Sequence, residues 1–229
     1  MTHRAHVAIS PNDLNRGLRR SLWPALKSRG FTDRTERAAW RRVDGDIDVI
    51  EVQVVGQDAD AVGCPSVSFS AYVACYPRFL TGTGPSVPEK HGLPRPHYWH
   101  CDPFNRAMNK TIGQPWFRPL AEPGPRSMLP SFRLHREGLM RVLRRDVHDR
   151  PDIWYVREDG ANLDEDLRDM MAVVMSEGLA YLSTIHDPVG VLGLLERGDI
   201  GNRDSPRSFY LSESIKEYLL EPRGGARNG

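Results

Sequence analysis

Two histidines and a cysteine form the densest group of chemically active side chains in the sequence. His97, His100 and Cys101 lie within five consecutive positions. Imidazole nitrogen and thiolate sulfur are ligands that zinc and related transition metals accept. This spacing indicates, as one alternative, a metal- or thiol-dependent enzyme centred on these three residues. Residues elsewhere in the chain that could complete such a site are Cys64, Cys75 and His91.

The same three residues also have a simpler interpretation as packing groups. Tyr98 and Trp99 separate the two histidines, and the cluster lies in a proline-rich stretch that aromatic side chains would hold in place. The spacing is not that of a zinc finger or zinc ribbon, because the chain contains no Cys-x-x-Cys pair. We therefore predict no cofactor, and keep zinc or another transition metal as the alternative.

Polar side chains on one predicted strand form the second candidate site. Apolar and polar residues alternate between Ser66 and Tyr76, which is typical of a strand with one buried face. If the proline-rich stretch folds over the polar face, hydroxyls and an aromatic ring would line a pocket. If that face is hydrated, it is the solvent side of an antiparallel sheet. The residues predicted to bind a ligand are Glu51, Gln53, Ser66, Ser68, Ser70 and Tyr72.

A helix and a hairpin are the first elements that the sequence predicts. Ser10-Pro11 is a good helix start, leucines follow at four-residue spacing, and Gly30 can take the left-handed conformation that ends a helix. Pro24 interrupts the leucines, so we expect a kink or a break there. Strands are predicted over 38–43 and 47–55, joined by the turn at Asp44-Gly45.

The second strand of this hairpin has an irregular pattern. Ile47 and Val49 share one face, whereas Ile50, Val52 and Val54 share the other. A bulge near Val49–Ile50 would bring all five to one side, and this is the favoured interpretation. Otherwise the strand is central and covered on both faces.

Residues 77–130 form a long irregular insertion. They hold eleven of the eighteen prolines, which excludes a long helix or a central strand. Large aromatic residues such as Trp116 would be costly to leave in water, so we expect the segment to fold onto the domain as a cover. Within it, Asp102-Pro103 predicts the start of one short helix that reaches Ile112.

The remaining elements complete a mixed fold. Short strands are predicted at 132–135 and 153–156, a long helix from Asn162, a short helix over 189–197, and a last amphipathic helix from Ser205. The predicted class is α+β, with an antiparallel sheet of about four to six strands packed on one face by the N- and C-terminal helices. Residues 1–221 are expected to form a single domain, and residues 222–229 a disordered tail.

Composition and charge exclude few functions. The formal net charge of +1 creates no whole-chain attraction to nucleic acid or to an anionic membrane, although arginines cluster around 34–42 and 133–145. Nucleic-acid binding is therefore only the third alternative. The chain has no apolar run of membrane-spanning length and no signal-peptide pattern. Three widely spaced cysteines do not suggest a disulfide framework, and we expect a cytoplasmic protein.

The segment from Leu22 to Gln53 resembles the bacterial domain-of-unknown-function family 4304. Members of that family resemble this segment in three elements. A helix ends in Leu-Lys-x-x-Gly-Phe, a short strand with an aromatic residue and an arginine follows, and the next strand ends in Val-x-x-Gln. The matching positions are Leu26, Lys27, Gly30, Phe31, Arg34, Trp40, Arg41, Val49, Ile50 and Gln53.

The resemblance covers roughly the first quarter of the chain, and the rest only by element order. Trp154, the helix near 179–182 and Asp187 fit that order. Val54-Val55 departs from it, since Lys-Ser is expected after the glutamine, and the proline-rich insertion is longer than expected. The resemblance implies an α+β fold and a small cytosolic bacterial protein, and it implies no reaction.

These observations favour a non-catalytic protein. The chain has no Gly-x-Ser-x-Gly, His-Glu-x-x-His or phosphate-loop motif, and no evident pairing of a nucleophile with a base. We therefore predict a binding or protein-interaction module for a small ligand or a protein partner, with toxin neutralisation as one possible role. The enzyme centred on His97, His100 and Cys101 remains the alternative.

Overall fold

The computed structural model describes residues 9–59, 64–78, 87–113, 150–197 and 200. Several predicted features lie outside these residues: the strand at 132–135, the helix from Ser205, the tail at 222–229 and part of the proline-rich insertion. They stay predictions.

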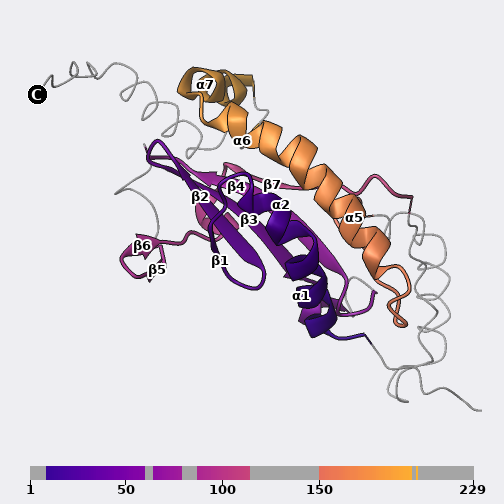
Figure 1. Cartoon of the computed structure of the whole chain (residues 1–229). Coiled ribbons are helices and arrows are strands. Elements are labelled where there is room, and N and C mark those ends of the chain that lie inside the picture. Colours follow the sequence, from indigo (N-terminus) through magenta and orange to yellow (C-terminus); the bar gives the residue numbers. More distant parts are fainter. Residues whose placement is uncertain (1–8, 60–63, 79–86, 114–149, 198–199, 201–229) are drawn as a thin grey trace, which may run out of the picture.

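An antiparallel sheet of five strands forms the centre of the described structure (Figure 1). The order is β1-β2-β3-β4-β7. The strands are β1 (Asp33–Arg34), β2 (Ala38–Val43), β3 (Asp46–Val54), β4 (Phe69–Tyr76) and β7 (Asn105–Ala107). A separate two-stranded hairpin consists of β5 (Glu89–Lys90) and β6 (Leu93–Pro94). The predicted α+β class with an antiparallel sheet is confirmed.

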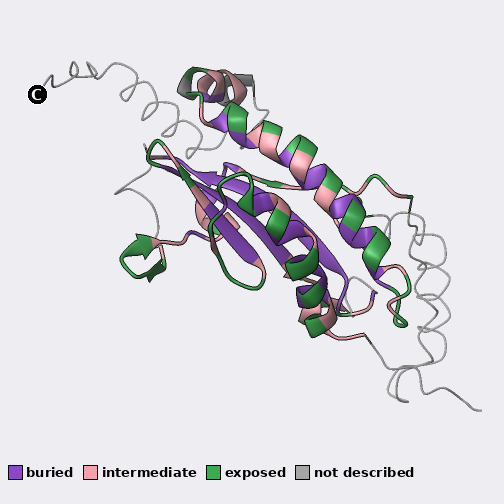
Figure 2. Cartoon of the chain, in the orientation of Figure 1, coloured by how far each residue is buried: buried purple, intermediate pink, exposed green. Residues whose placement is uncertain are grey.

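The α-helices of the described residues lie on one side of this sheet (Figure 1). They are α1 (Pro11–Arg20), α2 (Leu22–Lys27), α5 (Leu163–Val173), α6 (Leu179–Ile185) and α7 (Pro188–Arg197), with a π-helical turn at Val174–Gly178 joining α5 to α6. Among these helices, α1, α2, α5 and α6 cover one face of the sheet, and α7 packs against α6. Their inner sides are buried and their outer sides exposed, as Figure 2 shows. The N-terminal helices α1 and α2 therefore pack on the same face as the later helices α5 and α6, as predicted for the described part of the chain.

The break in the N-terminal helix lies three residues before the predicted position. α1 ends at Arg20 and α2 begins at Leu22, so Pro24 falls in the first turn of the second helix. Proline is tolerated there because the first turn leaves its N–H groups without helical partners. The Ser21 side chain donates a hydrogen bond to the Gly17 carbonyl at the break (2.9 Å). The leucine stripe continues through it, and Leu14, Leu18, Leu22 and Leu26 are all fully buried.

The hairpin between β2 and β3 has the predicted turn but not the favoured bulge. Asp44 and Gly45 both have positive φ angles, 49° and 92°, which is the conformation that a tight hairpin turn requires. Each residue of β3 that pairs with β2 or β4 has one partner, and consecutive residues have consecutive partners. The bulge near Val49–Ile50 was therefore a wrong expectation, and the alternative of a central strand covered on both faces is correct.

Two apolar layers explain the pattern of β3. Ile50 and Val52 pack against the helices, whereas Ile47 and Val49 pack in a second cluster on the far face of the sheet. Trp40, Tyr76 and Cys101 are buried in that second cluster. The cover comes from the proline-rich segment, whose short 3-10 helix η3 (Tyr98–Cys101) lies on this face, and the Pro96 carbonyl accepts a hydrogen bond from the Trp40 indole (2.7 Å).

Three other local predictions differ from the structure. β4 begins at Phe69 and not at Ser66, because residues 65–68 form a turn in which the Ser68 N–H bonds the Pro65 carbonyl. No helix follows Asp102-Pro103, since the chain pairs with β4 as strand β7 instead. Residues 153–156 make only a single bridge, Phe69 with Trp154, and not a strand.

Candidate functional site

Polar side chains interrupt the far face of the sheet beside its apolar cluster. Glu51 and Gln53 of β3 pair in register with Tyr72 and Ser70 of β4, so all four side chains project to the same face. These are four of the six residues predicted to bind a ligand. The alternation of both strands and their antiparallel register bring them together.

Glu51 anchors η3 to the sheet. Its carboxylate accepts hydrogen bonds from the Tyr98 N–H (3.3 Å) and from the Gln53 amide (3.2 Å), and lies 3.2 Å from His97 Nδ1. Only 6% of Glu51 is exposed. A buried carboxylate is costly without partners, and these contacts offset that cost. Two of the three contacts of Glu51 thus reach Tyr98 of η3 and His97 directly before it.

Tyr98 extends this cover over the neighbouring strand. Its ring stacks on that of Tyr72, with ring centroids 3.9 Å apart and planes 13° from parallel. Its hydroxyl lies 3.5 Å from the Gln53 side-chain oxygen. Burial, together with the neighbouring Tyr72, raises the pKa of Tyr98 to about 12. The segment 97–101 therefore closes over part of the polar face and fixes the Tyr72 ring.

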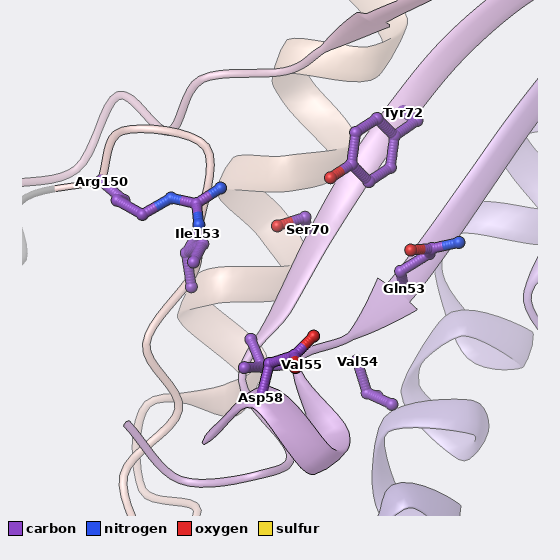
Figure 3. Close-up of a pocket in the computed structure, with 8 residues that line it drawn as sticks. All are labelled: Gln53, Val54, Val55, Asp58, Ser70, Tyr72, Arg150 and Ile153. Carbon is purple, nitrogen blue, oxygen red and sulfur yellow. The ribbon is translucent and has the colours of Figure 1, made fainter. Parts of the chain in front are cut away.

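A pocket of about 340 Å³ remains open beside this cover (Figure 3). The residues that line it are Gln53, Val54, Val55, Asp58, Ser70, Tyr72, Arg150 and Ile153. In Figure 3 the hydroxyls of Ser70 and Tyr72 lie on the same side of the strand as Arg150, which enters from a distant part of the chain. Apolar walls with a few convergent polar groups are typical of small-molecule sites.

Arg150 brings a positive charge to this pocket. Its Nε and Nη2 atoms donate to the Asp152 carboxylate, and half of its side chain is exposed. The hydrogen bond to Asp152 raises the pKa of Arg150, so the group stays protonated. The Arg150 N–H bonds the Tyr155 hydroxyl at 3.2 Å, which fixes the backbone at this point. No local sequence pattern signalled Arg150 as a site residue.

The six predicted ligand-binding residues occupy different environments. Gln53, Ser70 and Tyr72 line the pocket, whereas Glu51 lies under η3. Ser68 is fully buried and its hydroxyl accepts a hydrogen bond from the Val156 N–H (3.2 Å), so it serves the connection to residues 153–156. Ser66 is exposed in the turn before β4.

The predicted metal cluster of His97, His100 and Cys101 packs mainly within η3. The Nδ1 atom of His100 accepts a hydrogen bond from the His97 N–H (3.0 Å). Cys101 is fully buried, and its thiol lies 3.5 Å from the His97 carbonyl oxygen. Burial raises the pKa of the Cys101 thiol, so the thiol stays protonated at neutral pH.

Comparison with known proteins adds no relative. No family model, no curated protein and no solved structure matches this chain. The resemblance of residues 22–53 to family 4304 therefore stays a prediction. Among the described residues, no helix has both the length and the apolar character that crossing a bilayer requires.

Proposed function

We propose that this protein is a non-catalytic binding module whose pocket takes a small polar ligand with an acidic group. The observation that carries the proposal is the approach of Arg150 to the hydroxyls of Ser70 and Tyr72 around one cavity of about 340 Å³. That volume suits a metabolite-sized molecule. A guanidinium beside hydroxyl donors is a common arrangement for binding a carboxylate or a phosphate.

The donors of the pocket support an acidic ligand. Asp152 engages Nε and Nη2 of Arg150, and Nη1 makes no hydrogen bond to a described residue. The Ser70 hydroxyl likewise has no hydrogen-bond partner among the described residues. Asp58 supplies an acceptor within the same pocket, so a ligand that also carries a donor group gains a second contact.

Two features favour binding over catalysis. Tyr72 is held by its stack with Tyr98, and Arg150 is held by Asp152, so these two side chains are oriented before a ligand arrives. The described lining contains no histidine and no cysteine. The broader prediction of a protein-interaction module has one supporting observation, since Trp99 on η3 is 49% exposed. Toxin neutralisation, a role within that prediction, draws no separate support from the described residues.

Calorimetric titration of the full chain at low ionic strength tests the proposal. The probes are inorganic phosphate, glycerol 3-phosphate, acetate and glutamate, which separate phosphate from carboxylate recognition. We expect at least one probe to bind, and Arg150→Gln to weaken it by roughly tenfold or more, the loss of a charged hydrogen bond. The matched control is Arg20→Gln, which removes another exposed, ion-paired arginine on α1.

The proposal fails in either of two cases. In the first, none of the four probes binds with a Kd below about 10 mM. In the second, Arg150→Gln binds the best probe as tightly as the wild type and the Arg20→Gln control do. A Ser70→Ala variant, which changes no charge, gives a second measurement of the same pocket.

A further inference from the structure

A different group of side chains gathers at one end of the sheet, on the face that the helices cover. Asp46 and Asp48 project from β3, and Cys75 projects from β4, where it is the register partner of Asp48. His186, which directly follows α6 (Leu179–Ile185), lies beside them and bonds Asp48. Three elements far apart in the sequence thus bring a carboxylate, a thiol and an imidazole together.

Hydrogen bonds hold Asp48 and His186 in fixed orientations. Asp48 Oδ1 lies 2.7 Å from His186 Nε2, while Asp48 Oδ2 accepts from Nε and Nη2 of Arg41 at 2.8 and 2.7 Å. Asp48 is fully buried, so these partners compensate its charge. A carboxylate that orients a histidine in this way is the usual outer partner of a metal-binding imidazole.

Asp46 and Cys75 complete the cluster beside that pair. One ligand atom from each of Asp46, Cys75 and His186 can be chosen so that all three lie within 4.8 Å of one another. Asp46 Oδ1 accepts the Arg78 N–H at 2.8 Å, so the carboxylate is held. Among the described residues this is the one group of three potential ligands that converges so closely.

We propose that Asp46, Cys75 and His186 bind a single divalent transition metal of the zinc type. One oxygen, one sulfur and one nitrogen ligand suit Zn²⁺ or Co²⁺, whereas Mg²⁺ and Ca²⁺ require oxygen ligands throughout. Three protein ligands leave a fourth tetrahedral position for water. The candidate site is largely buried, with Asp46 6% exposed and the His186 side chain 19% exposed.

Two carboxylates and two arginines, Arg41 and Arg78, carry the charges around the cluster. Asp48 pairs with the Arg41 guanidinium, Asp46 accepts the Arg78 N–H, and Cys75 is fully buried in the apolar core. Burial and the two carboxylates raise the pKa of Cys75, so the thiol keeps its proton while no cation is present. When a metal binds, that proton passes to solvent and the thiolate coordinates the ion.

A bound metal would link the end of α6 to strands β3 and β4. A ligand that binds only the folded chain stabilises it by mass action, so the metal should raise the melting temperature. This site is separate from the pocket at Arg150, because Asp46 and Cys75 lie on the opposite face of the sheet from Ser70 and Tyr72. The two proposals can therefore succeed or fail independently.

Cobalt titration of the chelator-treated full chain tests the proposal. We expect one Co²⁺ per chain, a thiolate-to-cobalt charge-transfer band, and visible absorption of tetrahedral intensity that Zn²⁺ abolishes by competition. Cys75→Ser should remove the charge-transfer band. Cys64→Ser and Cys101→Ser are the matched controls, because each replaces another buried cysteine and should leave the band unchanged.

The Cys101→Ser control also separates the two metal hypotheses of this chain. Loss of the band in Cys101→Ser and its retention in Cys75→Ser would overturn the proposal in favour of the cluster around His97. Absence of any band in the wild type would overturn it as well.

A measurement on the wild type covers the case in which Cys75→Ser does not fold. X-ray absorption of the zinc-loaded protein should show one sulfur at about 2.3 Å and the remaining ligands as nitrogen or oxygen. Two or more sulfurs, or none, would contradict the ligand set. Peptide mapping after alkylation should show that zinc protects Cys75 and leaves the reactivity of Cys64 unchanged.

Discussion

Tyr98 lies flat on Tyr72, with ring centroids 3.9 Å apart and the two planes 13° from parallel. The first residue belongs to η3 in the proline-rich segment and the second to β4 in the centre of the sheet. This contact, together with the hydrogen bond from the Tyr98 N–H to Glu51, fastens the cover to the sheet, and Tyr72 also lines the pocket. It is therefore the first relationship to test.

Removal of the Tyr98 ring should loosen the cover. We expect Tyr98→Ala to lower the free energy of unfolding by about 1–3 kcal/mol, since a half-buried ring and an aromatic pair are lost. Tyr98→Phe keeps the stack and should cost less than about 1 kcal/mol, because the hydroxyl contact with Gln53 is long. Urea denaturation of the three proteins measures the difference, and equal losses in both variants would contradict a role for stacking.

The hydroxyl of Tyr98 should make stability depend on pH in the alkaline range. Burial raises its pKa to about 12, whereas in the unfolded chain it ionises near 10. Below pH 10 the group is neutral in both states and its full contribution is present. Above pH 10 the unfolded chain loses the proton first, so this contribution declines until the pH passes about 12.

The comparison with Tyr98→Phe isolates this effect from the other tyrosines. The difference in unfolding free energy between the wild type and the variant should be constant up to about pH 9 and shift against the wild type between pH 10 and 12. Chemical denaturation at several pH values measures it. A difference that does not change with pH would mean that Tyr98 titrates normally.

Glu51 should control the order of η3 more than the stability of the sheet. Glu51→Ala removes the acceptor of the Tyr98 N–H and leaves that donor at a half-buried position, which costs roughly 1–3 kcal/mol. Trp99, which stacks on His97 at 4.3 Å, reports on η3 through its fluorescence. We expect the emission to shift to longer wavelength in Glu51→Ala and to stay unchanged in Glu89→Ala, an exposed glutamate of β5.

The polar face of the sheet could be predicted because the alternation of side chains along a strand can be read from neighbouring residues. Gln53, Ser70 and Tyr72 line the pocket, and the pattern of β3 and β4 places them on one face. Alternation cannot locate the start of a strand, however. Ser66 and Ser68 continue the pattern of β4 through a turn that begins after Pro65, which is why their environments differ from the expected one.

The parts of the site that sequence reasoning missed depend on contacts between distant segments. Arg150 reaches the pocket from a segment with no regular structure, so no periodicity marks it. The choice between a bulge and a central strand in β3 depended on whether Ile47 and Val49 had a second apolar layer to pack against. That layer comes from η3 and its neighbours, and local pattern does not indicate their position. His186 likewise meets Asp48 only through the packing of α6 on the sheet.

The buried pair of Arg41 and Asp48 provides the largest expected effect on stability. Asp48 is fully buried and the Arg41 side chain is only 20% exposed. Asp48→Asn leaves the guanidinium without its carboxylate and also weakens the bond to His186, so we expect a loss of about 3–5 kcal/mol. The matched control is Asp164→Asn, which breaks the exposed ion pair with Arg20 and should cost less than about 1 kcal/mol. Urea denaturation at neutral pH compares the two, and a loss at Asp48 as small as that at Asp164 would show that the buried pair contributes no more than a surface contact.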